Sequence, residues 1–316
     1  MTTIDREQFV DGRAARWQRL EQLLSKGPGS GEEWGEFAAA YRCVCADLAV
    51  ARSAALPADV QDYLDELAGR AHNQLYGVRP VNLGRSILRD VLSGFPRELR
   101  ANLAFFVLAS LLFYGPFALG ALGAWFDPTF AGRVLSPDQL AEMESAYSGD
   151  LVRGASADAG MAGFYVFNNV GIAFRVFATG ALFGVGSIFY LVYNGLVIGT
   201  VFGYLGSVGL AGNLLAFTSG HSAWELTAIC VSGSAGLRLG WTLLVPSGRT
   251  RLGALRAARM SLYRLILGAA FMLTIAAAIE GFWSAGPVPP AGKFVFGAIQ
   301  IGIVAGWLTL GGRRDP

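Results

Sequence analysis

Long stretches without charge are the feature that most limits what this chain can fold into. Residues 102–125 contain no charged side chain, and Arg175 is the only one among residues 161–210. A membrane-spanning helix needs about 20 consecutive apolar residues, because the hydrocarbon core of a bilayer is about 30 Å thick. The chain is 15% charged, whereas soluble domains are about 25% charged. The sequence therefore predicts an all-α, polytopic membrane helix bundle.

Six candidate transmembrane helices follow residue 100. The segment 161–210 is too long for one span, and Gly184-Val185-Gly186-Ser187 disfavours a continuous helix, so we place a tight turn there. The six spans are therefore expected at about residues 102–125, at two positions within 161–210, and at 223–245, 262–283 and 293–311.

The first hundred residues differ from the rest, because they hold more than half of the charged side chains. Apolar residues at helical spacing predict three helices there, which can form a small bundle. Residues 81–99 place apolar side chains on one face and arginines elsewhere, a pattern typical of an interfacial amphipathic helix. We therefore expect residues 1–98 to form a cytoplasmic helical bundle plus this amphipathic helix, and residues 99–316 to form the six-span domain.

The charges of the connecting segments predict the orientation. Residues 246–264 contain five arginines and no acid, whereas residues 127–158 contain six acids and two arginines. Arginine-rich loops stay in the cytoplasm, so we expect an external loop at 127–160 and, with six spans, N- and C-termini in the cytoplasm. Ser136 and Gln139 have the spacing of a capping box, which predicts a short helix in the external loop.

Polar side chains inside the spans are the candidate functional residues. An ionisable group near the bilayer centre costs at least about 2.5 kcal/mol, so such groups face the protein interior and pair. His221 and Glu225 are four residues apart and share one helix face, and Glu280 is the further acid that can join them. The intramembrane polar network that we expect contains Asn168, Asn169, Arg175, Asn194, His221, Glu225, Arg238 and Glu280.

Three interpretations of this network are open from the sequence. It can be a buried structural network, a path for protons or ions, or part of a catalytic metal site. Two ligands on one helix do not make a metal site, and no HExxH motif or second carboxylate cluster completes one. The sequence also contains no Walker loop and no serine nucleophile elbow. We therefore expect no catalytic residues, no metal and no cofactor, in a protein that is not an enzyme.

Small residues repeat every four positions on three of the spans. This spacing lets helix backbones approach closely in lipid, so it predicts tight packing of the bundle, a homo-oligomer interface, or both. The glycines of these runs are Gly195, Gly199, Gly203, Gly236, Gly240, Gly302 and Gly306.

Several longer motifs occur in a characteristic order. They are FAAAYRCVCADLAVAR, YLDELAGRAHNQLYG, FNNVGIAFRVFATGALFGVGS, YNGLVIGTVFG and SGHSAWELTAICVSGSAGLRLGWTLLVPSGRTR. Over about residues 5–260 the chain resembles the bacterial stage II sporulation protein M family, with Ser222 departing from the glycine that usually follows the histidine. The resemblance implies a multi-pass inner-membrane protein, and spore-forming members anchor peptidoglycan-degrading partners during engulfment.

The hypothesis from the sequence is a non-enzymatic scaffold in the lipid bilayer, which docks soluble cytoplasmic and envelope protein partners. The alternatives are an ion or small-solute transporter or channel that uses the intramembrane His, Glu and Asn residues, and a metal-dependent intramembrane hydrolase. A net charge of +2 provides no basic surface for nucleic acid, which we exclude as a partner. The 23 arginines and 2 lysines suggest a GC-rich genome and not a typical spore former.

Overall fold

Every regular element that the structure describes is a helix, and no strand occurs among the described residues. This result confirms the all-α fold class. The chain divides into two compact units, Met1–Leu83 and Gly84–Pro316, and each has a hydrophobic core of its own. The computed structural model describes residues 5–76, 83–148, 169–284 and 286–313.

Four helices form the first unit, and the three predicted from the apolar spacing are among them. Each of the three longer helices hides one apolar face, with Leu20, Val44 and Leu64 fully buried. The additional short helix contributes Phe9 to the same core. The four helices are α1 (Arg6–Asp11), α2 (Ala14–Lys26), α3 (Gly31–Ser53) and α4 (Ala58–Tyr76).

A buried carboxylate joins α2 to α3. Asp47 on α3 accepts a hydrogen bond from the indole N–H of Trp17 at 2.8 Å and another from the Arg13 guanidinium at 3.1 Å. The Arg16 guanidinium lies 3.5 Å from the same carboxylate. A buried charge is tolerated when it is paired and hydrogen-bonded, so these contacts explain why an acid lies in the core of the first unit.

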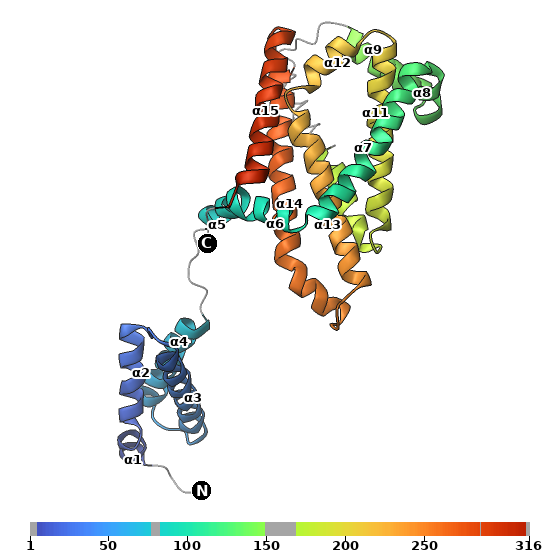
Figure 1. Ribbon diagram of the computed structural model, residues 1–316. Coiled ribbons are helices and arrows are strands. Elements are labelled where there is room, and N and C mark those ends of the chain that lie inside the picture. Colours follow the sequence, from blue (N-terminus) through green and yellow to red (C-terminus); the bar gives the residue numbers. More distant parts are fainter. Residues whose placement is uncertain (1–4, 77–82, 149–168, 285, 314–316) are drawn as a thin grey trace. The chain divides into compact units, whose positions relative to one another are not determined.

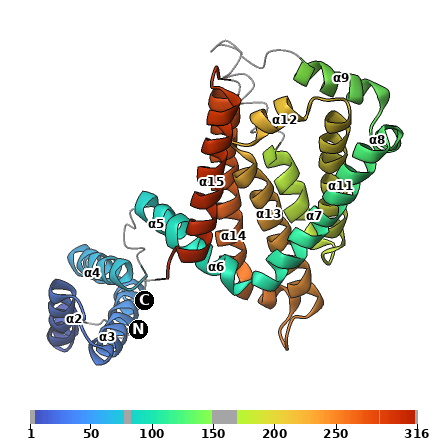
Figure 2. The ribbon, with the colours of Figure 1, turned by 45° about the horizontal axis from the view of Figure 1, so that its top comes forward.

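Five long helices form the body of the second unit. Figures 1 and 2 show α7 beside α11, α14 beside α15, and α13 between these two pairs. The five are α7 (Leu103–Phe126), α11 (Val185–Ser207), α13 (Ser222–Leu244), α14 (Arg251–Ile279) and α15 (Pro290–Leu310).

Shorter elements gather at the two ends of this body (Figure 2). One end carries α8 (Pro128–Val134), α9 (Pro137–Ser148), α12 (Ala211–Thr218) and the π-helix η3 (Glu280–Ser284) that continues α14. The other end carries α5 (Leu83–Arg89), the π-helix η1 (Asp90–Gly94) and α6 (Phe95–Ala101). A helical segment 169–178 and the 3-10 turn η2 (Thr179–Ala181) precede α11.

Four helical segments in the described part of the chain are long and apolar enough to cross a membrane. The predicted spans at 102–125 and 293–311 correspond to two of them, and the predicted turn is present because α11 begins directly after Gly184, which has a φ of +88°. The predicted span before this turn lies partly outside the described residues. The four segments are Leu103–Phe126, Val185–Ser207, Arg251–Ser284 and Pro290–Leu310.

The predicted span at 223–245 is present as the helix α13, but α13 is not among the four apolar segments. It carries Glu225 and Arg238 and many small residues, which lower its mean hydropathy. More than half of its residues are buried, because the neighbouring helices surround it (Figure 2). A helix that other helices cover does not need a lipid-compatible surface. The count of six spans stays a prediction.

Two of the three small-residue runs lie in contacts within the chain. A Cβ atom at Gly195, Gly199 or Gly203 would overlap a backbone carbonyl oxygen of α7, so this run lets α11 pack directly on α7. A Cβ at Gly236 or Gly240 would overlap atoms of the segment that precedes or begins α11. These five glycines therefore serve the tight packing that the spacing predicted.

The third run differs, because Gly302 and Gly306 have no atom within 4 Å of the position that a Cβ would take. Gly302 is exposed and Gly306 is half-buried on the outer face of α15. This run makes no close helix contact within the described part of the chain. A homo-oligomer interface through small residues therefore stays a prediction for this run alone.

Residues 83–101 form the predicted amphipathic segment, and they pack on α14 and α15. The Phe95 ring is fully buried and lies 5.2 Å from the Trp307 ring, measured between centroids. Arg264 Nε lies 3.2 Å from the carboxylate of Asp90, and the Arg100 guanidinium donates to two carbonyl oxygens at the end of α15, each at 2.6 Å. This segment belongs to the second unit.

The external loop was expected at 127–160, and its described part, residues 127–148, forms α8 and α9. Ser136 and Gln139 make the predicted capping box, with the Ser136 N–H donating to the Gln139 side chain at 2.9 Å and the Gln139 N–H donating to the Ser136 hydroxyl at 3.3 Å. The Tyr204 hydroxyl donates to the Glu144 carboxylate, which joins α9 to α11. The helix α9 is therefore docked on the bundle.

The helix α14 begins earlier than predicted. Its first residue is Arg251, whereas the fifth span was expected at 262–283 and the arginines before it in a loop. The Thr250 hydroxyl accepts a hydrogen bond from the N–H of Gly253 at 3.1 Å and so caps the helix. Leu, Ala and Arg are good helix formers, and long arginine side chains can keep their charge in water. Four of the five arginines therefore lie on a helix.

Candidate functional site

Three titratable side chains meet where α13 begins and α14 ends. His221 is the N-cap of α13, Glu225 follows one turn later, and Glu280 is the first residue of η3. His221 Nε2 lies 3.7 Å from Glu225 Oε2 and 4.0 Å from Glu280 Oε1. The side chains of His221 and Glu280 are 3% and 8% exposed. The structure therefore brings together the three residues that the sequence analysis expected to meet.

Two further residues complete what we call the polar cluster: His221, Glu225, Glu280, Ser284 and Lys293. The Ser284 hydroxyl lies 3.0 Å from His221 Nδ1, within hydrogen-bond distance. The ammonium group of Lys293 is buried and donates to the backbone carbonyl oxygen of Ser284 at 2.6 Å. Ser284 thus holds the imidazole with its side chain and the lysine with its backbone.

Contacts from α15 hold the junction of α12 and α13 beside the cluster. The indole N–H of Trp224 donates to the side-chain oxygen of Gln300 at 2.8 Å, and both residues are buried. A Cβ at Gly297 would come within 2.5 Å of the Ser219 carbonyl oxygen, so only glycine allows this approach. The Ser219 hydroxyl donates to the carbonyl oxygen of Lys293 at 3.2 Å. The surroundings of His221 are therefore fixed by three helices.

The spacing inside the cluster has a chemical consequence. Hydrogen bonds from N–H to oxygen span about 2.7–3.2 Å, so His221 Nε2 is too far from both carboxylates for a direct bond. One ligand atom from each of His221, Glu225 and Glu280 lies within 4.8 Å of the others. One imidazole nitrogen and two carboxylate oxygens are ligand types that divalent metals use. The cluster can hold a cation or a proton.

Other residues of the predicted network lie elsewhere. Arg175 is exposed, the amide of Asn194 donates to the carbonyl oxygen of Tyr190 at 2.7 Å within α11, and the Arg238 guanidinium lies 5.8 Å from the Phe105 ring centre. Within the described residues no hydrogen bond or ion pair links any of these three to the polar cluster. The structure therefore does not bring these three residues to the polar cluster, and their place in one network stays a prediction.

The two remaining residues of the predicted network are adjacent asparagines. Asn168 lies outside the described residues, and Asn169 is buried at the start of the helical segment 169–178. The prediction that they join the cluster therefore stays a prediction.

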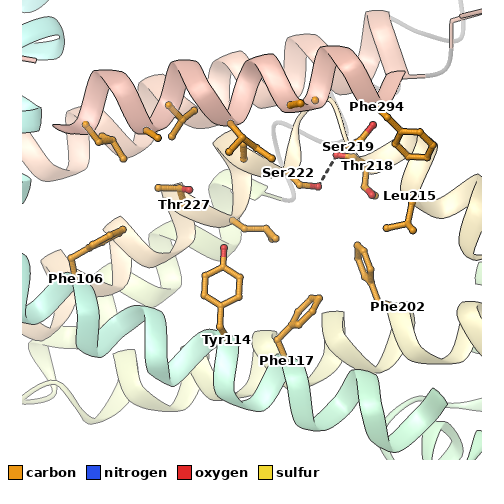
Figure 3. A pocket seen from close by; sticks show the side chains of 18 residues that line it. Phe106, Tyr114, Phe117, Phe202, Leu215, Thr218, Ser219, Ser222, Thr227 and Phe294 are labelled. Carbon is orange, nitrogen blue, oxygen red and sulfur yellow. Dashed lines mark hydrogen bonds between the residues drawn. The ribbon is translucent and has the colours of Figure 1, made fainter. Parts of the chain in front are cut away.

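An apolar cleft of about 810 Å³ lies between α7 and α11 on one side and α13 and α15 on the other. Thr218 and Ser222 line one end, where the Ser222 hydroxyl donates to the Thr218 carbonyl oxygen at 2.6 Å (Figure 3). No carboxylate, imidazole or lysine lines the cleft, so the cleft and the polar cluster are separate features. The aromatic side chains that line it are Phe106, Tyr114, Phe117, Phe202 and Phe294 (Figure 3).

Sequence reasoning missed two residues of the polar cluster, Lys293 and Ser284, and the neighbouring Gln300 for identifiable reasons. Lys293 is one of two lysines in the chain and begins an apolar span, and Gln300 lies inside the same span. Polar residues at membrane depth are functional candidates, so both could have been identified as candidates from the sequence. Ser284 could not, because serine is common in membrane helices and its partner His221 is 63 residues away.

Comparison with known proteins adds two matches. The family described as Stage II sporulation protein M matches residues 103–285, which contain α7 to η3 and the cluster residues except Lys293. A family described as a domain of unknown function matches residues 7–77, which form nearly all of the first unit. Comparison with the curated proteins and with the solved structures found no match.

Proposed function

Because the chain belongs to the stage II sporulation protein M family, we propose that this membrane protein is a non-enzymatic scaffold of the bacterial inner membrane. The helices of the second unit anchor it in the lipid bilayer. The first unit docks a soluble cytoplasmic partner, and the segment α8–α9 docks an envelope protein. In this proposal the membrane subunit positions its partners and supplies no chemistry of its own.

The observation that carries the proposal is the independent first unit. Residues 1–83 form a separate compact body with a core of 14 buried hydrophobic residues, and a different family matches them. A domain that folds around its own core and is attached to a membrane bundle has no role in spanning the membrane. Its exposed helix faces are available to a soluble partner.

The arrangement of arginines supports a multi-pass topology with both termini in the cytoplasm. Arg264, Arg97 and Arg100 lie at the end of the second unit where α15 ends, and they contact Asp90 and the carbonyl oxygens of residues 308–312. The segment with α8 and α9, which contains three acids and one arginine, lies at the opposite end (Figure 1). Arginines favour the cytoplasmic side, so α8 and α9 face the exterior in the proposed topology.

The structure gives the transporter hypothesis less support. A path for ions needs polar groups distributed through the depth of the bundle, but Arg175, Asn194 and Arg238 do not join the polar cluster. The cleft that runs along the bundle is apolar. Within the described residues, the polar groups therefore do not form one continuous path.

Affinity purification tests the scaffold proposal. The full chain and a variant that lacks residues 1–83 are solubilised in detergent and purified, and the proteins that accompany them are quantified. We expect a stoichiometric soluble partner with the full chain and its loss with the shortened chain, while the shortened chain remains folded. The proposal fails if neither form brings down a stoichiometric partner and the deletion changes nothing.

A further inference from the structure

The polar cluster presents three ligand atoms to one small space. His221 Nε2 faces a Glu225 oxygen at 3.7 Å and a Glu280 oxygen at 4.0 Å, and the side chains come from the start of one helix and the end of another. Two ligand atoms of a tetrahedral zinc ion lie about 3.3 Å apart, because the bonds are about 2.0–2.2 Å long. The two separations from His221 Nε2 exceed this value by less than 1 Å, and all three ligand atoms lie within 4.8 Å of one another, so side-chain movements can bring them onto one ion.

The imidazole is oriented as a metal ligand is. The nitrogen that does not face the carboxylates, Nδ1, lies 3.0 Å from the Ser284 hydroxyl. Metal-binding histidines use their second nitrogen in this way, and the hydrogen bond fixes the tautomer and the ring orientation. In the tautomer that carries its proton on Nδ1, this nitrogen donates to the Ser284 hydroxyl, and Nε2 presents a lone pair toward two carboxylate oxygens. A cation between them removes the repulsion of the three electron-rich atoms.

The charges of the three ligands also suit a divalent cation. Glu225 and Glu280 bring two carboxylates close to one imidazole. A divalent ion bound by one neutral imidazole and two carboxylates balances the charge of its ligands.

We propose that His221, Glu225 and Glu280 bind a zinc ion that joins the start of α13 to the end of α14. The mixed nitrogen and oxygen ligands fit zinc, which also binds more tightly than manganese or ferrous iron at a given site. Three protein ligands leave the fourth position to water. The site is independent of the partners proposed above, so its failure leaves the scaffold proposal standing.

Metal content tests the proposal on the full-length protein. The chain is purified in detergent without added metal or chelator, and zinc is measured by mass spectrometry against protein concentration. We expect about one zinc per chain, and no zinc in Glu280→Gln or in His221→Asn. Glu98→Gln is the matched control, because Glu98 lies near Arg264 and away from the cluster, and it must retain the zinc.

A second measurement, the affinity of the protein for added zinc, tests the proposal if the ion is lost during purification. Thermal unfolding of the stripped protein is followed as zinc chloride is added. We expect zinc to raise the Tm of the wild type and of Glu98→Gln but not of Glu280→Gln, while Ser284→Ala weakens zinc affinity about 10- to 100-fold. If Glu280→Gln does not fold, Glu225→Gln takes its place, because Glu225 is also a proposed ligand and is less deeply buried.

Three results overturn the proposal. The first is a wild type without bound zinc whose Tm does not respond to zinc. The second is a response that Glu225→Gln and Glu280→Gln retain. The third is one equivalent of manganese or iron in place of zinc, which overturns the choice of zinc.

Discussion

The ring of Phe95 lies in the space that a side chain at Gly268 would occupy. A Cβ built at position 268 would overlap the ring carbons, and the ring is fully buried. This contact joins the amphipathic segment before the first span to the middle of α14. Glycine is required there by the close approach of an aromatic ring, because no turn or positive φ occurs at this position.

We expect Gly268→Leu to destabilise the second unit by about 1–3 kcal/mol, since overpacking displaces a buried ring. Thermal unfolding of the detergent-solubilised protein measures the effect. Gly302→Leu is the control, because no atom lies within 4 Å of a Cβ at that position, and its Tm should match that of the wild type. Equal Tm values for all three proteins would contradict the described packing.

Replacing the buried Asp47 should cost the first unit much more stability than replacing the exposed Asp65. Asp47→Ala leaves the Trp17 indole and the Arg13 guanidinium without their acceptor, and hydrogen bonds to charged groups contribute about 1.5–3 kcal/mol. Asp65→Ala removes an exposed ion pair with Arg52, for which we expect less than about 1 kcal/mol. Urea unfolding of residues 1–83, which have their own core, gives both values. Similar losses for the two variants would show that Asp47 is not held as described.

The first unit should lose stability in acid. The backbone N–H groups of Gly29 and Ser30 donate to Glu33 and lower its pKa, and hydrogen bonds from Arg19 lower the pKa of Glu36. A carboxylate with a lowered pKa stabilises the folded state above its unfolded pKa. This contribution is present above the ordinary glutamate pKa of 4.5 and is lost as the pH falls through the lower pKa of the folded state.

Urea unfolding of residues 1–83 between pH 7 and pH 3 measures this dependence. Glu33→Gln should have a weaker dependence than the wild type, because the group that titrates is gone. Glu32→Gln, at the neighbouring position in the first turn of α3, is the control and should retain the wild-type dependence. A stability that rises from pH 5 to pH 3 would contradict the expected sign.

Sequence reasoning succeeded where the pattern is local. Apolar spacing predicts the helices of the first unit, the capping box at Ser136 predicts the start of α9, and the glycines at 184–186 predict the turn before α11. The spacing of His221 and Glu225 predicts their shared face, because four residues make about one helical turn.

The remaining features depend on tertiary contacts that no local pattern encodes. The approach of Ser284 to His221 joins residues far apart in sequence, and so does the docking of α11 on α7. The arginines of residues 246–264 predict a loop, whereas the cap at Thr250 starts α14 at Arg251. The helix α13 can carry polar residues because the other helices cover it, and this cover is not visible in its own sequence.

The two docking faces must lie on opposite sides of the membrane if the scaffold account is correct. Cys43 is exposed in the first unit and Ser145 is exposed on α9. In a chain that carries Ser145→Cys, a membrane-impermeant maleimide can therefore label one thiol on each docking face. Cys45 is only half-buried, so the measurement uses a Cys45→Ala background.

The most direct test is to label this protein in intact and in permeabilised cells and to locate the label by peptide mass spectrometry. The account predicts that the thiol introduced by Ser145→Cys is labelled in intact cells and that Cys43 is labelled only after permeabilisation. Labelling of both positions in intact cells, or of neither, would place the two faces on the same side and contradict the scaffold that spans the membrane between its partners.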